Sequence, residues 1–352
     1  MKRKYVAAMI AAASTAMAAC GGASEGTTNG HENVELTFVT SFPEDHPLNA
    51  GFFMFTKELE KRAPWITVNY KGGPETMDPD LMIEGVQSGA VDGASLPGDY
   101  YVQQVPSLEL ARFSPFTPTE EREEGVAQLW EEIHEQVGLH YVGHSISGIP
   151  QTLFLKDKTN GPDFTGLSIR TSSATSNMVK SLGGTPVDLP GGEIYTALER
   201  GVIDGSAWTS VGATALGIPK VAKYYVQPRF YDSLANTVIN HKTWESLDPA
   251  TQTAVTETMT DLEPKIFKHF GQVAAKETAG WEDAGVKPLT FTGRDEQKVL
   301  SVAYRDAWDS LDWGRISSKG PEAGALRTKF KDAYADDLSS AVPGGTTIAP
   351  KE

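Results

Sequence analysis

The sequence predicts an α/β protein of two similar lobes, each a mixed, mainly parallel sheet flanked by helices. Two stretches are nearly the same, VQSGAVDGAS at residues 86–95 and LERGVIDGSA at residues 198–207. Each leads from a helix end through a glycine into a buried strand. The repeated segment alone is also typical of two ordinary helix–strand connections. Because each copy lies inside a complete strand–helix–strand run, the pattern of a parallel sheet, two lobes are favoured. The 352 residues, 39% of them hydrophobic, suffice for two cores.

The first run begins with residues 34–42, whose side chains alternate between apolar and polar and predict a strand. Residues 49–63 predict a helix with Phe52, Phe55 and Leu59 on one face. The rest of the run is a strand at 66–73, a helix at 77–89 and a short buried strand at 90–96. Asp78 can cap the second helix and Gly89 can end it.

The elements that follow repeat this order. Residues 117–138 predict one helix, which Thr117 can cap, and residues 139–146 predict a strand. The second run has strands at 166–172, 185–190 and 202–208 and helices at 176–184 and 191–201. The last third is mostly helical, at 246–285 and 294–312, and Pro264 predicts a kink or a break. Beyond about Lys331 the residues become small and polar, which predicts a frayed end.

The N-terminus predicts export. A basic start, MKRKY, precedes a short apolar run, so residues 1–19 are expected to be a secretory signal. Cys20 follows MAA, which resembles a bacterial lipobox, and we expect it to carry lipid at the periplasmic or cell surface. The alternative is ordinary cleavage after Ala18, with an unmodified thiol. Cys20 is the only cysteine, so it cannot form an internal disulfide. Residues 20–33 predict a flexible linker.

Charge and motifs exclude several functions. Lys and Arg total 31 and Asp and Glu total 46, a net charge of −15, so nucleic acid is not expected as a partner. The motifs HExxH, GxSxG, GxGxxG and the P-loop are absent, and we do not expect an enzyme. His140 and His144 lie on a predicted strand, where their spacing corresponds to about 13 Å. We therefore expect surface or edge histidines there, not a shared metal ion.

Arg170 is the strongest candidate for ligand binding. It ends an apolar strand just before a polar segment that leads into a helix. In open α/β sheets, ligands bind outside the carboxyl ends of the strands. The guanidinium group is a rigid, permanently charged fork that suits a carboxylate. The alternative is a structural arginine paired with one of the many acids.

Taken in order, residues 166–208 resemble the core signature of the TRAP-transporter extracytoplasmic solute-binding proteins, the DctP-type family. Further matching pieces lie at 42–48, 86–95, 190–205 and 239–255, and the resemblance covers roughly residues 34–330. It implies a clamp like that of the periplasmic binding proteins, with a helix that spans both lobes. It also implies capture of a small organic acid and its delivery to a membrane permease. The expected division is lobe I at 34–146 plus 235–275, lobe II at 147–234 plus 276–331, and a tail at 332–352.

The resemblance implies roles for residues of lobe II. Arg170 falls on the arginine that grips the ligand carboxylate, and Trp208 on a ligand-facing position, although it could be a core tryptophan. Gln151 matches a glutamine that helps to hold ligand and metal in some members. The glutamate that holds the metal in those members is Ala207 here, so we expect neither a metal nor another cofactor. Pro150 occupies the neighbourhood where sugar-acid binders carry a second arginine.

Ligand contacts are also expected from lobe I, with turn or core roles as the alternative. These candidates are Glu75, Phe42 near His46, Tyr101 with its neighbour Tyr100, and Asn236. The motif sequences are most similar to those of family members that bind 2-oxo or hydroxy monocarboxylates. The alternatives are a C4-dicarboxylate or sugar-acid binder, a ligand-sensing receptor on the same fold, and a component of an ABC-type permease. The sequence does not identify the ligand.

Overall fold

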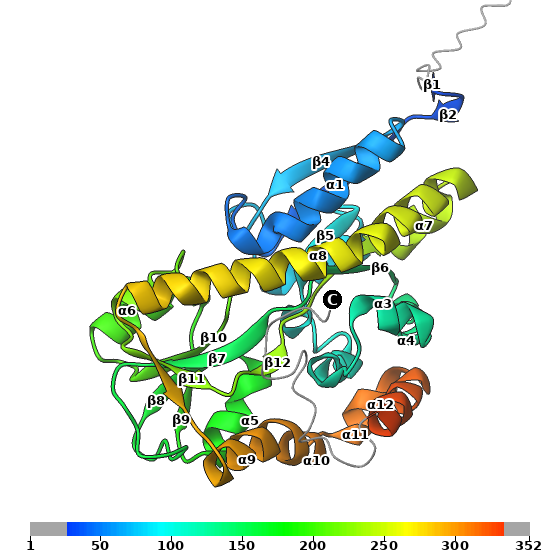
Figure 1. Cartoon of the computed structure of the whole chain (residues 1–352). Coiled ribbons are helices and arrows are strands. Elements are labelled where there is room, and N and C mark those ends of the chain that lie inside the picture. The colour runs from blue at the N-terminus through cyan, green and yellow to red at the C-terminus, as the bar shows by residue number, and fades with distance from the viewer. Residues whose placement is uncertain (1–26, 334–352) are drawn as a thin grey trace, which may run out of the picture.

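The computed structural model describes residues 27–333 and contains two α/β lobes joined along a long helix, α8 (Figure 1). Lobe I is built on a five-stranded sheet in the order β4-β3-β5-β13-β6. Its strands are β3 (Val34–Thr40), β4 (Ile66–Gly72), β5 (Gly93–Pro97), β6 (Leu139–Ile146) and β13 (Ala235–Asn240).

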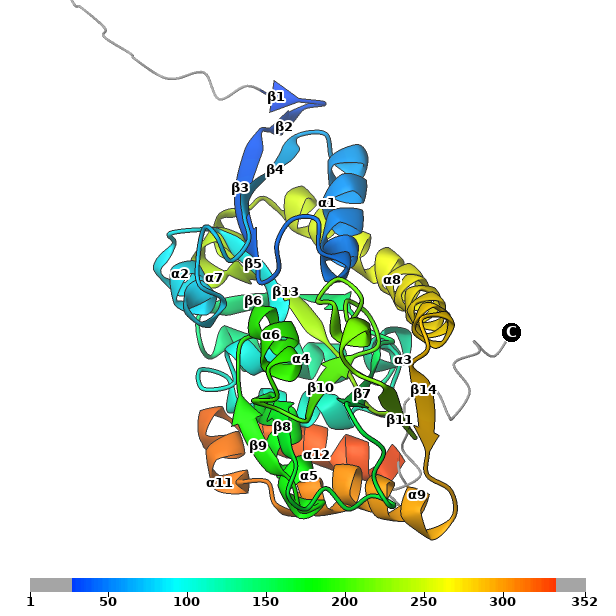
Figure 2. The same ribbon diagram turned by 90° about the vertical axis from the view of Figure 1, so that its left-hand side faces the viewer.

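Lobe II is built on a seven-stranded sheet in the order β14-β11-β7-β10-β8-β9, with β12 paired to β7. Figure 2 shows the strands of the two sheets one above the other. The lobe II strands are β7 (Pro150–Leu155), β8 (Ser168–Thr171), β9 (Thr185–Asp188), β10 (Gly205–Thr209), β11 (Tyr224–Gln227), β12 (Phe230–Asp232) and β14 (Lys287–Thr290).

One strand in each sheet is antiparallel to the others. In both lobes it is the strand that follows a crossing of the chain from the other lobe. The chain leaves β6 through residues 147–149 and begins β7, which pairs antiparallel with β10, β11 and β12. It returns through residues 233–234 into β13, which pairs antiparallel with β5 and β6. The carboxyl ends of the other strands therefore face the region between the lobes, which we call the interlobe junction.

The helix α8 (Pro249–Asp283) runs along both lobes (Figure 1). It packs on α1 and β6 in lobe I, and Trp281 near its end contacts the rings of Phe154 and Tyr225 in lobe II. Of the kink or break expected at Pro264, the break does not occur, because the helix continues through this residue. Met259, Ile266 and other apolar side chains on this face are buried in the lobe I core, and this packing compensates for the missing backbone donor.

The predicted helix over residues 117–138 is two helices. Gly125 adopts φ +71° between them, a left-handed conformation that ends one helix and starts the next. The lobe I helices are η1 (Pro47–Asn49), α1 (Ala50–Arg62), η2 (Pro79–Leu81), α2 (Met82–Ser88), η3 (Gly98–Tyr100), η4 (Pro106–Phe113), α3 (Pro118–Glu123), α4 (Val126–Glu135) and α7 (His241–Ser246). Those of lobe II are α5 (Ser173–Ser181), η5 (Gly191–Glu193), α6 (Ile194–Glu199) and η6 (Ile218–Lys220).

Part of the expected linker is ordered. Residues 27–32 form a hairpin of β1 (Thr27–Thr28) and β2 (His31–Glu32), closed by Asn29 and Gly30, both with positive φ. An Asn-Gly pair is the preferred sequence for such a two-residue turn. The His31 ring stacks on Trp65 with centroids 4.0 Å apart, which attaches the hairpin to lobe I.

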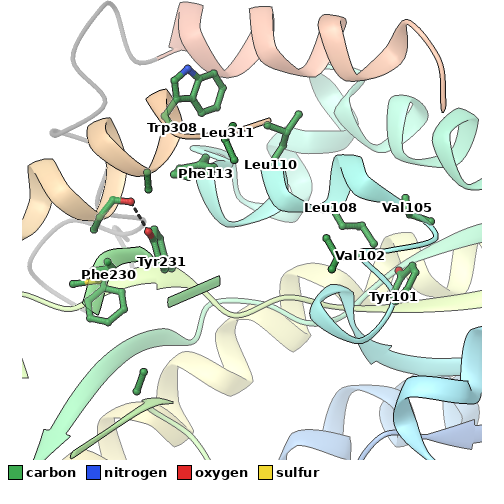
Figure 3. Packing of buried hydrophobic residues seen from close by; sticks show 14 of the residues in the cluster. Tyr101, Val102, Val105, Leu108, Leu110, Phe113, Phe230, Tyr231, Trp308 and Leu311 are labelled. Carbon is green, nitrogen blue, oxygen red and sulfur yellow. Dashed lines mark hydrogen bonds between the residues drawn. The ribbon is translucent and has the colours of Figure 1, made fainter. Parts of the chain in front are cut away.

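The C-terminal helices connect the lobes a further time. They are α9 (Arg294–Leu300), the π-helical η7 (Ser301–Asp306), α10 (Ala307–Asp309), α11 (Trp313–Ile316), η8 (Ser317–Lys319) and α12 (Glu322–Ala333). Figure 3 shows Phe113 between Tyr231 and Trp308, and the Tyr231 hydroxyl donates to the Ala303 carbonyl. We expected residues 276–331 in lobe II, but α12 packs on α4 and η4. In the described part of the chain no helix is both long and apolar enough to cross a membrane.

Candidate functional site

Arg170 lies at the interlobe junction, near the end of β8, with its guanidinium held by lobe II carbonyls. Nε donates to the Leu189 carbonyl at 3.0 Å and Nη1 to the Ala207 carbonyl at 3.3 Å. Among residues 27–333 no carboxylate forms an ion pair with it, which disfavours a structural salt bridge. Burial lowers the pKa of Arg170, an effect opposed by Tyr100, Asp188 and Asp99. The site thus holds a permanent cation that lacks a partner charge in contact.

Trp208 lies beside Arg170 on the same face of the sheet. In the parallel pair of β8 and β10, Arg170 is opposite Ser206, and Trp208 follows two residues later. The guanidinium carbon is 5.1 Å from the centroid of the Trp208 ring, a cation–π geometry. The ring is half-buried, and its Nε1 lacks a hydrogen-bond partner among the described residues. Together the two side chains offer a charge and an aromatic surface.

Glycines give the Trp208 ring its space and bring lobe I close to it. A Cβ on Gly191 would lie 2.8 Å from Cη2 of Trp208, so a larger residue there would displace the ring. A Cβ on Gly212 would lie 2.9 Å from Cε1 of His46 and 3.8 Å from Nε1 of Trp208. His46, which belongs to lobe I, therefore lies within a few ångströms of the lobe II site.

Gln151 lies at the same end of the sheet but on the other face. It is opposite Thr209 in β10 and Phe230 in β12, whereas Trp208 is opposite Thr152. Since side chains alternate between faces along a strand, Gln151 and Trp208 point to opposite sides of the sheet. The structure therefore brings Arg170 and Trp208 together and places Gln151 apart from them.

Three lobe I candidates surround the junction. Phe42 follows β3 and stacks on His46, with centroids 4.9 Å apart and an interplanar angle of 16°. Glu75 follows β4 and is exposed. Its Oε1 accepts a bond of 2.6 Å from the Gly73 amide, and this bond is the main reason why the pKa of Glu75 is lowered. Tyr100 is close enough to Arg170 for the cation to lower its pKa, although burial raises the pKa by more.

Tyr101 and Asn236 lie inside lobe I. Both are at least 96% buried, and the Asn236 amide donates to the Tyr101 hydroxyl at 2.6 Å. The same hydroxyl is 3.0 Å from Nε2 of His134, and Asn236 Oδ1 is 3.0 Å from Nδ1 of His144. The polar atoms of both side chains are thus hydrogen-bonded to other buried protein groups. Their contacts are those of core residues and not of residues that face a ligand.

His140 and His144 lie on β6, an edge strand of the lobe I sheet, as one of the two expectations had it. The expectation that they lie at the surface is wrong, because each is only 3% exposed. Nε2 of His144 lies 2.9 Å from the Glu121 carboxylate, and Glu121 is itself 2% exposed. Burial favours the neutral form of His144, but Glu121 and further partners outweigh it and raise its pKa. The strand β6 is buried along its whole length because α8 and α4 pack on it, which a strand pattern alone does not reveal.

Sequence reasoning missed two charged residues at the junction, Asp99 on η3 and Arg112 on η4. Asp99 retains an exposed surface, yet loss of water around it raises the pKa of its carboxyl. Arg112, a hydrogen bond from Ser172, and Arg170 oppose this rise, so both arginines act on the same carboxylate. The Arg112 guanidinium lies 4.7 Å from the Phe113 ring, and its buried Nε has no hydrogen-bond partner in the described structure. The sequence feature that could have identified Arg112 is its position inside the largely apolar stretch LELARF.

A pocket lies away from the junction, along α8, with a volume of about 610 Å³. Its lining includes Thr214, Lys220, Glu277 and Trp281. The Glu277 carboxylate already accepts the backbone amides of Gly212 and Thr214. The carboxylate of this groove is therefore already used by the protein backbone, and none of the residues predicted to bind ligand lines the groove.

The carboxyl ends of the strands of both lobes are directed at the interlobe junction. Arg170 lies there without an ion-pair partner among the described residues. This arrangement is that of a solute-binding clamp. A family model, that of the bacterial extracellular solute-binding proteins of family 7 (DctP), matches residues 38–310. The chain belongs to this family, and the predicted resemblance and fold class are confirmed.

Known relatives extend over most of the chain. A monocarboxylate 2-oxoacid-binding periplasmic protein of Nostoc is 26% identical over 334 residues, 89% of this chain and 88% of the relative. A TRAP periplasmic solute-binding protein from Desulfovibrio salexigens, solved with bound orotic acid, has TM-score 0.75 and 19% identity over 86% of this chain and 98% of its own. One from Bordetella bronchiseptica, with copurified calcium and picolinate, has TM-score 0.72 and 21% identity over 86% and 93%.

Proposed function

We propose that this chain is the extracytoplasmic solute-binding component of a TRAP-type transporter, and that it captures a small monocarboxylate for a membrane permease. The observation that carries the proposal is Arg170, an arginine without an ion-pair partner at the carboxyl ends of the lobe II strands. A carboxylate would supply the missing charge through a bidentate contact. Closure of lobe I would then bring Phe42, His46 and Glu75 toward the ligand.

The geometry favours one carboxylate on a flat or weakly polar body. Trp208 provides an aromatic surface 5.1 Å from the guanidinium, so a carboxylate on Arg170 would place the rest of the ligand near this ring. The Nostoc relative is named for monocarboxylate 2-oxoacids. Orotic acid and picolinate, the ligands named for the two structural neighbours, each carry one carboxylate.

A ligand with a second anionic group is the alternative, and Arg112 is the observation that favours it. Its Nε has no hydrogen-bond partner among residues 27–333, and its guanidinium acts on the same Asp99 carboxylate as Arg170. Asp99 offsets part of this positive charge, which is why we rank a dicarboxylate second. A sugar acid, with one carboxylate and a polar body, also ranks second because the Trp208 ring favours a less polar ligand.

The lobe II residues that correspond to a metal site in some family members do not favour a ligand that needs a divalent cation here. Hard cations take several oxygen ligands, largely from carboxylates. Ala207 supplies no side-chain oxygen, and Gln151 points to the other face of the sheet from Trp208. We propose that Arg170 alone neutralises the ligand carboxylate.

The test is calorimetry on chelator-treated protein against four classes of acid: 2-oxo monocarboxylates, aromatic monocarboxylates, C4-dicarboxylates and uronates. We expect binding to one of the first two classes without added cation. Tightest binding to a dicarboxylate would overturn the monocarboxylate assignment and point to Arg112. Tightest binding to a uronate would instead overturn the weakly polar ligand body. Binding that is lost after chelation and restored by Ca²⁺ would overturn the metal-free assignment.

Export and anchoring at Cys20 are also proposed, and this residue lies outside the described part of the chain. Mass spectrometry of protein extracted from bacterial membranes is the check. An acylated Cys20 at the mature N-terminus supports the anchor, and a mature chain that starts at Ala19 with a free thiol contradicts it.

A further inference from the structure

Two glutamates and one buried histidine meet at the outer end of lobe I. Glu131 and Glu135 are four residues apart on α4, so they lie on one face of the helix. His140 follows on β6, after a tight turn in which Gly138 adopts φ +76°. One ligand atom from each of the three side chains lies within 4.8 Å of the other two.

His140 supplies an unsatisfied nitrogen directed at this pair. The residue is 3% exposed, and its Nδ1 has no hydrogen-bond partner in the described structure. That atom lies 3.6 Å from Oε1 of Glu131, too far for a hydrogen bond. Stacking on Trp244, with centroids 3.6 Å apart and planes 7° from parallel, fixes the orientation of the ring. Buried polar atoms are normally satisfied, so this nitrogen lacks a partner that it should have.

We propose that Glu131, Glu135 and His140 bind a divalent transition-metal ion of the zinc class. Zinc takes imidazole nitrogen and carboxylate oxygen at about 2.0–2.2 Å, which separates neighbouring ligand atoms of a tetrahedral ion by about 3.3 Å. The 3.6 Å between Nδ1 and Oε1 is close to that value. Three protein ligands leave a fourth position for water. Ca²⁺ and Mg²⁺ prefer all-oxygen sites with more ligands, so this set does not suit them.

The charges around the cluster agree with a bound cation. Burial and, after it, the nearby His241 and His134 lower the pKa of His140 to about 3, so the ring is neutral and can donate its lone pair. The pKa of Glu131 is raised by burial and then by the charge of Glu135, with Glu132 adding to this and Arg122 opposing it. A metal ion would relieve the repulsion between the carboxylates.

The site is remote from the interlobe junction. His140 is near the start of β6, whereas Ile146 is at the junction end, six residues or about 20 Å away. The ion would therefore link α4 to the first residues of β6 without touching the transported acid. Its expected effect is on the stability of lobe I, because a ligand that binds only the folded state stabilises it.

The experiment measures Zn²⁺ binding to the chelator-stripped, tag-free chain by competition with a chromogenic chelator, together with the visible spectrum of the Co²⁺ form. We expect one site that is weakened at least about tenfold in Glu131→Gln and in Glu135→Gln, since even outer-shell changes cost 10–100-fold. Glu132→Gln removes the same charge from the same helix turn and should bind as the wild type does. Both glutamates at the site retain exposed surface, so these variants are expected to fold.

Three readouts decide the proposal. Zn²⁺ should raise the melting temperature of the wild type and of Glu132→Gln but not of the double variant Glu131→Gln/Glu135→Gln. Organic-acid binding should be unchanged in all variants, so this result is independent of the ligand assignment. Equal Zn²⁺ affinity in the wild type and the double variant, or no saturable site in the wild type, overturns the proposal.

Discussion

At the scale of single residues, the candidate site depends on how Arg170 is held. Two lobe II carbonyls accept from Nε and Nη1, and the Trp208 ring covers one side of the guanidinium. These contacts orient the group without neutralising it, because carbonyls and an aromatic face carry no net charge. The positive charge of the guanidinium can therefore be neutralised by an anion with two oxygens, such as a carboxylate.

We predict that Arg170→Ala weakens binding of the acid identified by calorimetry by about 2–5 kcal/mol, since the ligand carboxylate would be left without a partner. Arg170→Lys should recover only part of the loss, because an ammonium cannot reproduce the fork. Arg200→Ala removes an exposed charge from the same lobe and is the control, expected to bind as the wild type does. Wild-type affinity in Arg170→Ala would rule out the assignment.

At the scale of elements, a glycine divides one predicted helix, whereas a proline does not break another. The run at 117–138 contains Gly125 in a left-handed conformation, so it forms α3 and α4 and not one helix. The run that contains Pro264 stays continuous as α8, with Glu263 buried beside it and bonded to Arg122 at 2.5 Å. Local propensity decides the first case, and burial of the helix face against lobe I decides the second.

Two glycine substitutions should therefore have opposite signs. A Cβ at either Gly125 or Gly271 would meet no atom within 4 Å, so neither change creates a clash. Gly125→Ala should destabilise the protein by about 1–2 kcal/mol, because a side chain disfavours φ +71°. Gly271→Ala, inside α8, should stabilise it by about 0.5–1 kcal/mol. Denaturant titrations of both variants are the check, and shifts of the same sign would contradict this account.

At the scale of the whole molecule, one carboxylate ties together the two chain crossings between the lobes. Asp232 ends β12, just before the return crossing, and accepts backbone amides from the first crossing, from Gly148 at 2.8 Å and Ile149 at 2.6 Å. Burial raises the pKa of Asp232 to about 6, although these bonds and His144 lower it. The charge state of this residue is thus linked to the segments between which the lobes would hinge.

Stability should consequently depend on pH through Asp232. Its folded pKa, about 6, is above the ordinary value of 3.8, so the folded state binds its proton more tightly. The resulting stabilisation is present below pH 3.8, declines as pH rises toward 6, and is absent above that value. Its magnitude is at most about 3 kcal/mol. The difference in unfolding free energy between wild type and Asp232→Asn should therefore favour the wild type increasingly from pH 7 to pH 4.5, measured by denaturant titration. A difference that is constant with pH would refute the linkage.

The sequence by itself determined most of the local elements, the two α/β runs and the position of Arg170 at the carboxyl end of a strand. Each depends on short-range periodicity or turn residues, and none needs a distant partner. The proximity of Arg170 and Trp208 comes from the pairing of β8 with β10. Only the tertiary structure decided which strands are antiparallel to the others. These are β7 and β13, and each begins where the chain crosses from one lobe to the other. The tertiary structure also decided the burial of His140 and the enclosure of Tyr101 and Asn236. These depend on contacts between residues up to 135 positions apart, such as the bond between Asn236 and Tyr101, which no local pattern encodes.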